Sequence, residues 1–345
     1  MKILEGYQKG LNLGGWLSQY DEPTREHFDS FITEEDIKKI RSFGADHVRI
    51  PVDYEIFEEE DGTEKELGME YTDKCVEWAR KNGLRVVLDL HRTFGYTFDP
   101  LEKDGDKEIF FSDSGMQERF FAIWRRFAKR YGQEPDLVAF ELLNEIISPN
   151  VVEPWNEIAE KAIKEIRKIA PDSYIILGGV CYNHVRSVPD LRKPLDDKIV
   201  YNFHCYEPMI FTHQRAWWMD TMPKDIVVQY PETIESYREQ SKDLEGGTDS
   251  AIFDPAITEL GEPFFETLFA PAIEAAEKNG APLYCGEYGA IDQAPVEGIL
   301  NWLRDIHAVF ERHGIGHALW TYKQKDFGIV DEHYDPIRDE MIKLL

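Results

Sequence analysis

The sequence contains no long hydrophobic run and little positive charge. No window of about 18 uninterrupted apolar residues occurs, so no membrane span is expected. The chain has 39 Lys and Arg residues against 66 Asp and Glu residues, which gives a formal net charge of −27 at pH 7. This charge would repel a phosphate backbone, so nucleic-acid partners are not expected, whereas a neutral ligand would meet no such repulsion. Solubility is otherwise a sufficient reason for the acidity.

Cysteine is also scarce. The four cysteines lie far apart in the sequence and form no CxxC pair. This spacing argues against a disulfide framework and against a cysteine-ligated metal site. We therefore expect buried free thiols at Cys75, Cys181, Cys205 and Cys285.

Several motifs that mark other classes of enzyme are missing. The ten histidines form neither the HxH nor the HExxH pattern of metal-dependent hydrolases. The GxSxG segment that carries a serine nucleophile does not occur. Gly178-Gly179 is too short a glycine run for a phosphate-binding loop. Neither a metal nor another cofactor is expected.

Nothing in the sequence marks a division into domains. There is no low-complexity stretch, Gly/Ser linker or short repeat, so residues 1–345 are expected to form one domain and the protein a monomer. Residues 1–6 lack the apolar segment of a secretory signal. The compartment stays open between the cytoplasm and secretion followed by removal of a signal peptide.

Strand and helix patterns alternate along the chain. Strands are expected at residues 10–14, 45–51, 84–91, 137–145, 174–180, 199–206, 283–286 and 316–321. Helices are expected at residues 34–43, 71–81, 117–131, 154–169, 265–278 and 296–312, with a short crossover before the sixth strand and a short final helix. Parallel strands joined by helical crossovers leave few solutions besides a closed barrel. The sequence therefore predicts an α/β fold, a (β/α)8 TIM barrel.

The connection after the sixth strand is irregular. Residues 207–262 are too many for an ordinary loop between a strand and a helix, and they are rich in aromatic and charged side chains. We expect an inserted subdomain between strand six and helix six, lying over the barrel mouth. A surface excursion without a catalytic role is the alternative.

Polar and ionisable residues gather where the predicted strands end, while the strand interiors are aliphatic. In TIM barrels the active site lies at the carboxyl ends of the strands. We therefore expect one opening to collect Arg49, His91, Asn144, Glu145, His204, Tyr206, Glu287 and Trp320.

Two of these residues, Glu145 and Glu287, carry carboxyl groups, and hydrolysis of a glycosidic bond requires a pair of them. One carboxyl group protonates the leaving oxygen, and in a retaining enzyme the other attacks the anomeric carbon, with about 5–5.5 Å between the two. One carboxylate raises the pKa of its neighbour, and a guanidinium such as that of Arg49 keeps the nucleophile ionised. Judged by position alone, a structural or metal-binding role for the two glutamates is as well supported as a catalytic role. Glu141 faces the same side as Glu145 but lies deeper, so a structural role is expected for it.

Short segments surround these strand ends. They are GLNLGGW (10–16), VRIP (48–51), LDLH (88–91), LLNE (142–145), NFHCY (202–206), YCGEYG (284–289) and LW (319–320). In this order they resemble glycoside hydrolase family 5, the large cellulase family, and most of all its single-domain bacterial endoglucanases that carry an insertion after strand six. The resemblance runs from about residue 10 to residue 322. One departure is Arg92, where similar endoglucanases often carry a second histidine.

The resemblance implies roles in catalysis for particular residues. Glu145 matches the acid/base of the family, and Glu287 matches the nucleophile. Arg49 and Tyr206 match residues that hold and tune that nucleophile. Asn144 matches an asparagine that hydrogen-bonds the sugar 2-hydroxyl beside the cleaved bond.

Other matches concern sugar binding. His204 matches a histidine beside the acid/base, His91 one that binds sugar hydroxyls, and Trp320 the aromatic platform at subsite −1. Core packing is the alternative for His204 and Trp320. Aromatic residues on or beside the loops can also stack on sugar rings, and we expect one to three of them to form subsite walls. These candidates are Trp16, Trp155, Trp217, Trp218, Phe94 and Tyr96.

The implied activity is that of a retaining endo-β-1,4-glucanase acting on cellulose-type and mixed-linkage β-1,3-1,4-glucans, so the expected partner is a β-glucan polysaccharide or oligosaccharide. An exo-acting β-1,3-glucanase and a β-mannanase stay open, because they share the double displacement. A non-catalytic glycan-binding barrel is the alternative from another class. Such a binding protein would keep the aromatic residues but lack one of the two glutamates. Glu145 and Glu287 are both present, which favours an enzyme.

Overall fold

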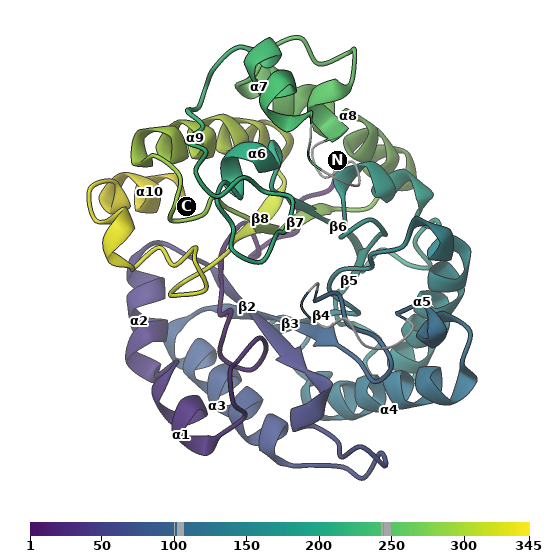
Figure 1. Ribbon diagram of the computed structural model, residues 1–345. Helices are drawn as coiled ribbons and strands as arrows, with labels where there is room; N and C mark the ends of the chain where they lie inside the picture. The colour runs from purple at the N-terminus through teal and green to yellow at the C-terminus, as the bar shows by residue number, and fades with distance from the viewer. Residues whose placement is uncertain (100, 102–106, 243, 245–249) are drawn as a thin grey trace.

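The structure is a computed structural model, and it describes residues 1–99, 101, 107–242, 244 and 250–345. Its strands are parallel and form a closed barrel in the order β1 to β8, with β8 pairing back to β1. Figure 1 looks along this barrel, with the strands at the centre and the helices around them. The predicted TIM barrel is confirmed. The strands are β1 Lys9–Asn12, β2 His47–Asp53, β3 Arg85–Arg92, β4 Val138–Glu141, β5 Ile175–Gly178, β6 Ile199–Cys205, β7 Leu283–Tyr288 and β8 Gly316–Leu319.

The helices follow the predicted pattern. Helices α3, α8 and α9 end at Gly83, Gly280 and Gly314, whose φ angles of 68°, 66° and 65° suit a residue without a side chain. Between β5 and β6 the predicted short crossover contains a 3₁₀ helix, Val185–Asp190. Within the described part of the chain, no helix combines the length and apolar character needed to cross a membrane. The helices are α1 Arg25–Ser30, α2 Glu34–Ser42, α3 Leu67–Asn82, α4 Ser114–Tyr131, α5 Val152–Arg167, α6 Met209–Thr212, α7 Ile234–Ser241, α8 Glu262–Asn279, α9 Val296–His313 and α10 Arg338–Leu344.

The inward-facing side chains of the barrel change from apolar to polar along the strands. Residues two apart on a strand share a face, so each strand contributes one side chain to successive layers. The first layer belongs to a small apolar cluster inside the barrel. The next layers are buried but polar, and they lead to the strand ends where the site lies. On β3 the series is Val87, Asp89 and His91, and on β6 it is Val200, Asn202 and His204.

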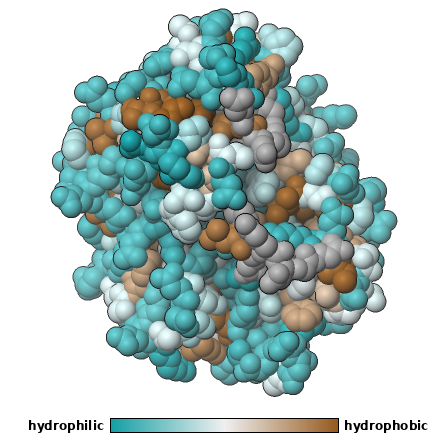
Figure 2. Space-filling model, viewed as in Figure 1, coloured by the Kyte–Doolittle hydropathy of each residue, from teal (hydrophilic) through white to brown (hydrophobic). Residues whose placement is uncertain are grey.

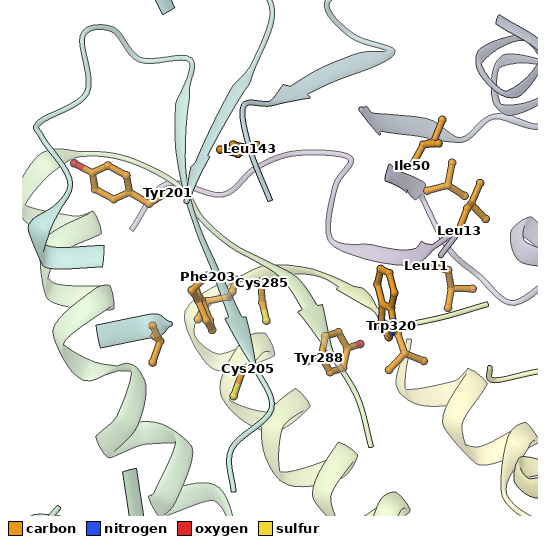
Figure 3. Packing of buried hydrophobic residues seen from close by; sticks show 14 of the residues in the cluster. Leu11, Leu13, Ile50, Leu143, Tyr201, Phe203, Cys205, Cys285, Tyr288 and Trp320 are labelled. Atoms are coloured by element: carbon orange, nitrogen blue, oxygen red, sulfur yellow. The ribbon is translucent and has the colours of Figure 1, made fainter. Parts of the chain in front are cut away.

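The outward faces of the strands pack on the helices. Figure 3 shows Phe203 and Cys205 of β6 beside Cys285 of β7, and Phe203 pairs with Cys285 in the strand register. The ring of Phe203 also contacts Phe269 of α8, at 4.9 Å between centroids. This contact fixes α8 against β6.

The expectation of buried free thiols holds for three cysteines and is wrong for the fourth. Cys75, Cys205 and Cys285 are free and buried, whereas Cys181 is exposed. Cys181 lies on the turn after β5 with φ of 57°, which directs it away from the core. The spacing of the cysteines indicated free thiols but carried no information on this turn.

The fourth strand is shorter than predicted and the seventh is longer. Ladder pairing between β4 and β5 ends at Glu141, four residues before Glu145. The aliphatic pair Leu142-Leu143 continued the sequence pattern although the ladder had ended. Strand β7 extends to Tyr288, so Glu287 lies inside the strand.

The segment after β6 divides into two parts. Helix α6 directly follows β6, and Thr212 there donates a hydrogen bond to the carbonyl of Tyr206. Helix α7, in contrast, lies at the outer edge of the molecule (Figure 1). Near it, the hydroxyl of Tyr230 donates to Asp305 of α9 at 2.9 Å. The expectation of one subdomain over the barrel mouth is therefore wrong for α7, because the buried Tyr230 holds this part of the chain to the outer helix layer.

Candidate active site

Arg49 on β2 organises the strand ends. Its side chain is fully buried, and its guanidinium forms a two-bond fork with Glu141 on β4: Nε donates to Oε2 at 2.7 Å and Nη2 to Oε1 at 2.8 Å. Nη2 also lies 3.0 Å from Oδ2 of Asp89 on β3. Burial acts to lower the Arg49 pKa, but these carboxylates and Glu287 raise it well above its ordinary value. The guanidinium is therefore a permanent positive charge beneath the site, and Glu141 has the structural role expected for it.

The remaining bonds of Arg49 reach upward into the site. Nη1 donates to Oε1 of Glu287 at 2.6 Å and to Oδ1 of Asn12 at 2.9 Å. Nη2 donates to Oδ1 of Asn144 at 2.8 Å. One side chain thus fixes two of the residues that sequence reasoning assigned to the site.

Glu287 is held at both carboxylate oxygens. Oε1 accepts from Arg49, and Oε2 accepts from the hydroxyl of Tyr206 at 3.0 Å. Its side chain is 7% exposed, so the carboxylate lies at the boundary between the buried layer and solvent. Burial raises the Glu287 pKa above its ordinary value, and the charge of Arg49 opposes this rise. Arg49 and Tyr206 therefore both favour the ionised form.

Glu145 faces Glu287 across His204. Oε1 of Glu145 lies 2.8 Å from Nδ1 of His204, and the same nitrogen lies 3.8 Å from Oε2 of Glu287. The three side chains offer one atom each within 4.8 Å of one another. Burial raises the Glu145 pKa well above its ordinary value, and the negative charge of Glu287 raises it further. Because Arg49 contacts Glu287 directly, a proton shared by the pair resides on Glu145.

Two histidines near the carboxyl pair are neutral. Burial and the charge of Arg49 lower the His204 pKa well below its ordinary value. Burial lowers the His91 pKa to about 3. Nδ1 of His91 lies 2.6 Å from Asp89, and the His91 ring stacks on Trp320 at 5.9 Å with an interplanar angle of 2°. A neutral imidazole ring can exchange hydrogen bonds with sugar hydroxyls without adding charge to the site.

Gly14 makes room for Trp320. A Cβ atom at Gly14 would lie 2.7 Å from the Trp320 ring, so a side chain there would displace the indole. This close approach explains why the predicted GLNLGGW segment needs a glycine at this position. Trp320 is 6% exposed and lies beside Leu11 and Leu13 in Figure 3.

The loop aromatics separate into buried and exposed groups. Trp16 is fully buried, donates from Nε1 to the carbonyl of Phe28 at 2.9 Å and stacks on Trp78. Trp155 is also buried, with Nε1 donating to the carbonyl of Gly178. The expectation that they are candidates for subsite walls is wrong, because both rings point into the helix layer.

Two other loop aromatics also have specific positions. The Tyr96 hydroxyl donates to the backbone carbonyl of Glu145 at 2.7 Å and accepts from the N–H of Ile147 at 2.9 Å. Tyr96 is 4% exposed, so it holds the loop of Glu145 and does not form a wall. Phe94 lies under the guanidinium of Arg119, 3.4 Å from the ring centroid.

Trp217 and Trp218 remain available at the surface. Trp217 is 63% exposed, and its Nε1 donates to Asp326 at 3.3 Å. Trp218 is half-buried against His213 and Phe327, both of which also contact the ring of Tyr206. These aromatics therefore continue from Tyr206 toward the solvent. The same face of the molecule is mostly hydrophilic, with separate apolar patches (Figure 2).

The structure adds residues that sequence reasoning did not single out. Asn12 of β1 supports Arg49 and also donates from Nδ2 to the carbonyl of Gly286 at 2.9 Å. Asn202 donates to Oε1 of Glu141 and accepts from the N–H of Gly286, both at 2.9 Å. Asn202 and Asp89 each lie two positions before a histidine of the site. That spacing was the signal that could have identified them.

Arg92, the departure noted in the sequence, lies beside acidic groups on the β2 side. Its Nη2 is 3.1 Å from Glu55, and its Nη1 is 4.0 Å from Asp53. The arginine therefore contributes to a charged cluster adjoining His91.

The carboxyl pair and His204 offer a donor set of the kind that can hold a metal ion. Both oxygens of Glu287, however, already accept hydrogen bonds from Arg49 and Tyr206. A permanent cation 2.6 Å from Glu287 also opposes a second cation at the same carboxylate. The donor set fits proton transfer and nucleophilic attack better than metal binding.

The chain is similar to a known protein family and to solved structures. A family model described as cellulase (glycosyl hydrolase family 5) matches residues 8–326. Cellodextrinase A of Ruminococcus flavefaciens is 44% identical over 310 residues, 90% of this chain and 84% of that protein. Endoglucanase C of Acetivibrio thermocellus is 40% identical over 342 residues, 98% of each chain. A solved hyperthermophilic endo-β-1,4-glucanase in complex with substrate aligns with a TM-score of 0.76 at 25% identity, covering 98% of this chain and 97% of that chain.

Proposed function

The chain belongs to glycosyl hydrolase family 5, the cellulase family, and we propose that this protein is an endo-β-1,4-glucanase that cleaves internal bonds with retention at the anomeric carbon. The observation that carries the proposal is the meeting of Glu145 and Glu287, whose nearest oxygens lie within 4.8 Å of each other. A retaining glycosidase needs its carboxyl groups about 5–5.5 Å apart, whereas an inverting one needs about 6.5–9.5 Å to admit a water molecule.

In the first step, the ionised Glu287 attacks the anomeric carbon while Glu145 protonates the departing glycosidic oxygen. A covalent bond forms between the sugar and the carboxylate, and the bond to the leaving chain breaks. Glu145, now ionised, then removes a proton from water, which attacks the same carbon and releases Glu287. The sugar leaves with its original anomeric configuration.

The surroundings of the two carboxyl groups support this division of roles. Glu287 has the guanidinium of Arg49 and the hydroxyl of Tyr206 as donors, which stabilise a carboxylate. The nearest partner of Glu145 is the neutral His204. Burial and the negative charge of Glu287 raise the Glu145 pKa well above its ordinary value, which favours the protonated acid. When Glu287 becomes esterified its charge disappears, the Glu145 pKa falls, and Glu145 changes from acid to base.

The substrate is a β-1,4-glucan, with Asn144 and His91 as hydrogen-bond partners of sugar hydroxyls and Trp320 as the platform at subsite −1. Asn144 is oriented by its bond from Arg49, and the rings of His91 and Trp320 lie parallel. We include mixed-linkage β-1,3-1,4-glucan among the substrates. A second candidate, cleavage of short cellodextrins, is favoured by the likeness to Cellodextrinase A.

Product analysis on carboxymethylcellulose, lichenan, laminarin, mannan and cello-oligosaccharides tests these assignments. A rapid fall in viscosity of the first two is the expected result for endo action. Cleavage of cello-oligosaccharides without a fall in viscosity would favour the cellodextrinase. Glucose released alone from laminarin, or activity confined to mannan, would favour an exo-β-1,3-glucanase or a β-mannanase. Failure to cleave any of these glycans would overturn the proposal.

A further inference from the structure

A second buried acidic residue directly follows the β6 strand end. Glu207 has a side-chain exposure of 7%, and its Oε1 lies 2.5 Å from Nε2 of His184, which belongs to the turn after β5. Its other oxygen, Oε2, accepts the backbone N–H of Tyr206 at 3.1 Å. Both carboxylate oxygens are therefore engaged, one by a neighbouring turn and one by a residue that contacts Glu287.

His184 is itself held in one orientation. Its Nδ1 accepts the backbone N–H of Arg186 at 3.1 Å and thereby caps the 3₁₀ helix Val185–Asp190. Since Nδ1 accepts a hydrogen bond, Nε2 carries the proton that points to Glu207. Burial acts to raise the Glu207 pKa, but His184, together with hydrogen bonds from the backbone and from Cys205, lowers it below its ordinary value, which favours the carboxylate.

The His184–Glu207 pair is continuous with the site. The backbone N–H of His204 donates to the carbonyl of Asn183 at 2.8 Å, next to His184. His184 and His204 also form an isolated parallel bridge. The carbonyl of Glu207 accepts from Nε1 of Trp302 on α9 at 3.0 Å. The pair thus closes a frame around His204 and Tyr206, the two residues that contact the Glu145–Glu287 carboxyl pair.

We propose that His184 and Glu207 are positioning residues, which hold the end of β6 so that Tyr206 and His204 meet the two carboxyl groups at working distance. The inference rests on the proposed function. The pair acts on the reaction only through Tyr206 and His204, because Glu207 is itself buried. A displacement of about 1 Å in a reacting group can lower a rate by about 100-fold, so a buried pair at this place can control kcat.

The first test variant is Glu207→Gln. A glutamine cannot accept hydrogen bonds at both positions: its amide NH2 must face either the Tyr206 N–H or the protonated nitrogen of His184. The second variant is His184→Asn. Asparagine keeps the helix-capping acceptor but is too short to reach Glu207. The double variant removes the pair altogether and reports whether the two residues act as one unit.

Asp196→Asn is the matched control. Asp196 likewise accepts from a basic side chain, Arg167 at 2.7 Å, and from a backbone N–H, Lys198 at 2.9 Å. It precedes β6, at the end of the strand opposite to Tyr206. This variant disturbs a similar bond set without touching the site.

The measurements are kcat and KM per competent site on cellotetraose and on an aryl cellobioside, with competent sites counted by stoichiometric trapping with a 2-fluoro glycoside. We expect both test variants to lower kcat about tenfold or more with little change in KM. The loss should appear on both substrates, because Tyr206 serves the attack by Glu287 whatever the leaving group. It should be at least as large on cellotetraose, because His204 contacts the acid Glu145, which a good aryl leaving group needs less. The double variant should lose no more than the worse single variant, and Asp196→Asn should retain wild-type kcat.

The inference would be overturned if both test variants kept the wild-type kcat per competent site. A lower melting temperature in such variants would then show that the pair has a structural role only. An equal loss of kcat in Asp196→Asn would also overturn the inference. An inactive wild-type protein would instead overturn the proposed function, so the two failures are distinguishable.

Discussion

Replacing Tyr206 by phenylalanine removes a single hydrogen bond from the nucleophile and leaves the ring in place. The hydroxyl donates to Oε2 of Glu287 at 3.0 Å and stabilises its ionised form. A hydrogen bond to a charged group contributes about 1.5–3 kcal/mol. At about 1.36 kcal/mol per pKa unit, the loss raises the Glu287 pKa by about one to two units.

The sign of the effect follows from the role of Glu287. The enzyme is active only while Glu287 is ionised, so a higher pKa removes activity from the acidic side of the profile. The acidic limb of kcat/KM should therefore move up by about one to two pH units. The alkaline limb depends on the proton of Glu145 and should stay in place, so the bell becomes narrower.

The assay is the pH dependence of kcat/KM on an aryl cellobioside, which reports the free enzyme. Tyr201→Phe is the control, because its hydroxyl donates to the carbonyl of Arg192 at 3.0 Å, away from the carboxyl pair. An acidic limb that does not move in Tyr206→Phe would refute the assignment of Tyr206 and Arg49 as the groups that tune Glu287. A shift of equal size in Tyr201→Phe would also refute it.

Four further outcomes are expected. Glu287→Ala should lower kcat by about 10⁴-fold or more with an unchanged circular dichroism spectrum, and substantial residual activity on cellulosic substrates would contradict its role. Glu145→Ala should slow cello-oligosaccharides by about 10²–10⁴-fold but aryl glycosides with good leaving groups far less, and equal losses would remove it from the acid role. Trp217→Ala should raise KM for long oligosaccharides more than for short ones, by several-fold for a ring contact of about 0.5–1.5 kcal/mol, and an unchanged length preference would leave it a surface residue. Burial lowers the His307 pKa to about 3. Unfolding therefore takes up a proton below about pH 6.5, so His307 lowers the free energy of unfolding as the pH falls. In His307→Gln this fall, measured by urea unfolding, should be shallower by about 1.4 kcal/mol per pH unit between pH 6.5 and 4.5. Parallel plots of unfolding free energy against pH for the two proteins would contradict this.

The fold could be predicted because each barrel unit carries a strong local signal. Strand β3 is an aliphatic run, as a strand buried on both faces requires. Helices α3, α8 and α9 each end at a glycine with a left-handed backbone. The signal failed after Glu141, where Leu142 and Leu143 continue the aliphatic pattern while the ladder stops. Hydrophobicity reports burial, and these residues are buried without being part of the strand.

The loop aromatics could not be assigned from the sequence. Trp16 and Trp217 both lie in loops at the strand ends, yet one is fully buried and the other is 63% exposed. The direction of Trp16 depends on the neighbouring Gly15, whose φ of 83° turns the chain so that the indole reaches the carbonyl of Phe28. Loop dihedral angles of this kind follow from tertiary contacts, which no local pattern of residue types records.

The buried support of the site, in contrast, follows a rule that the sequence does contain. A strand that alternates between barrel interior and helix layer must place residue i−2 on the same face as a site residue at i. A polar residue at i−2 in an otherwise aliphatic strand therefore lies under the site and has no water to bind. Asp89 below His91 and Asn202 below His204 satisfy this condition, and each bonds to a group of the site or to its support. The polar residues that support a barrel site thus extend one layer inward from the mouth. A polar residue in that layer needs a hydrogen-bond partner, because burying a neutral polar group without one costs on the order of 2–7 kcal/mol.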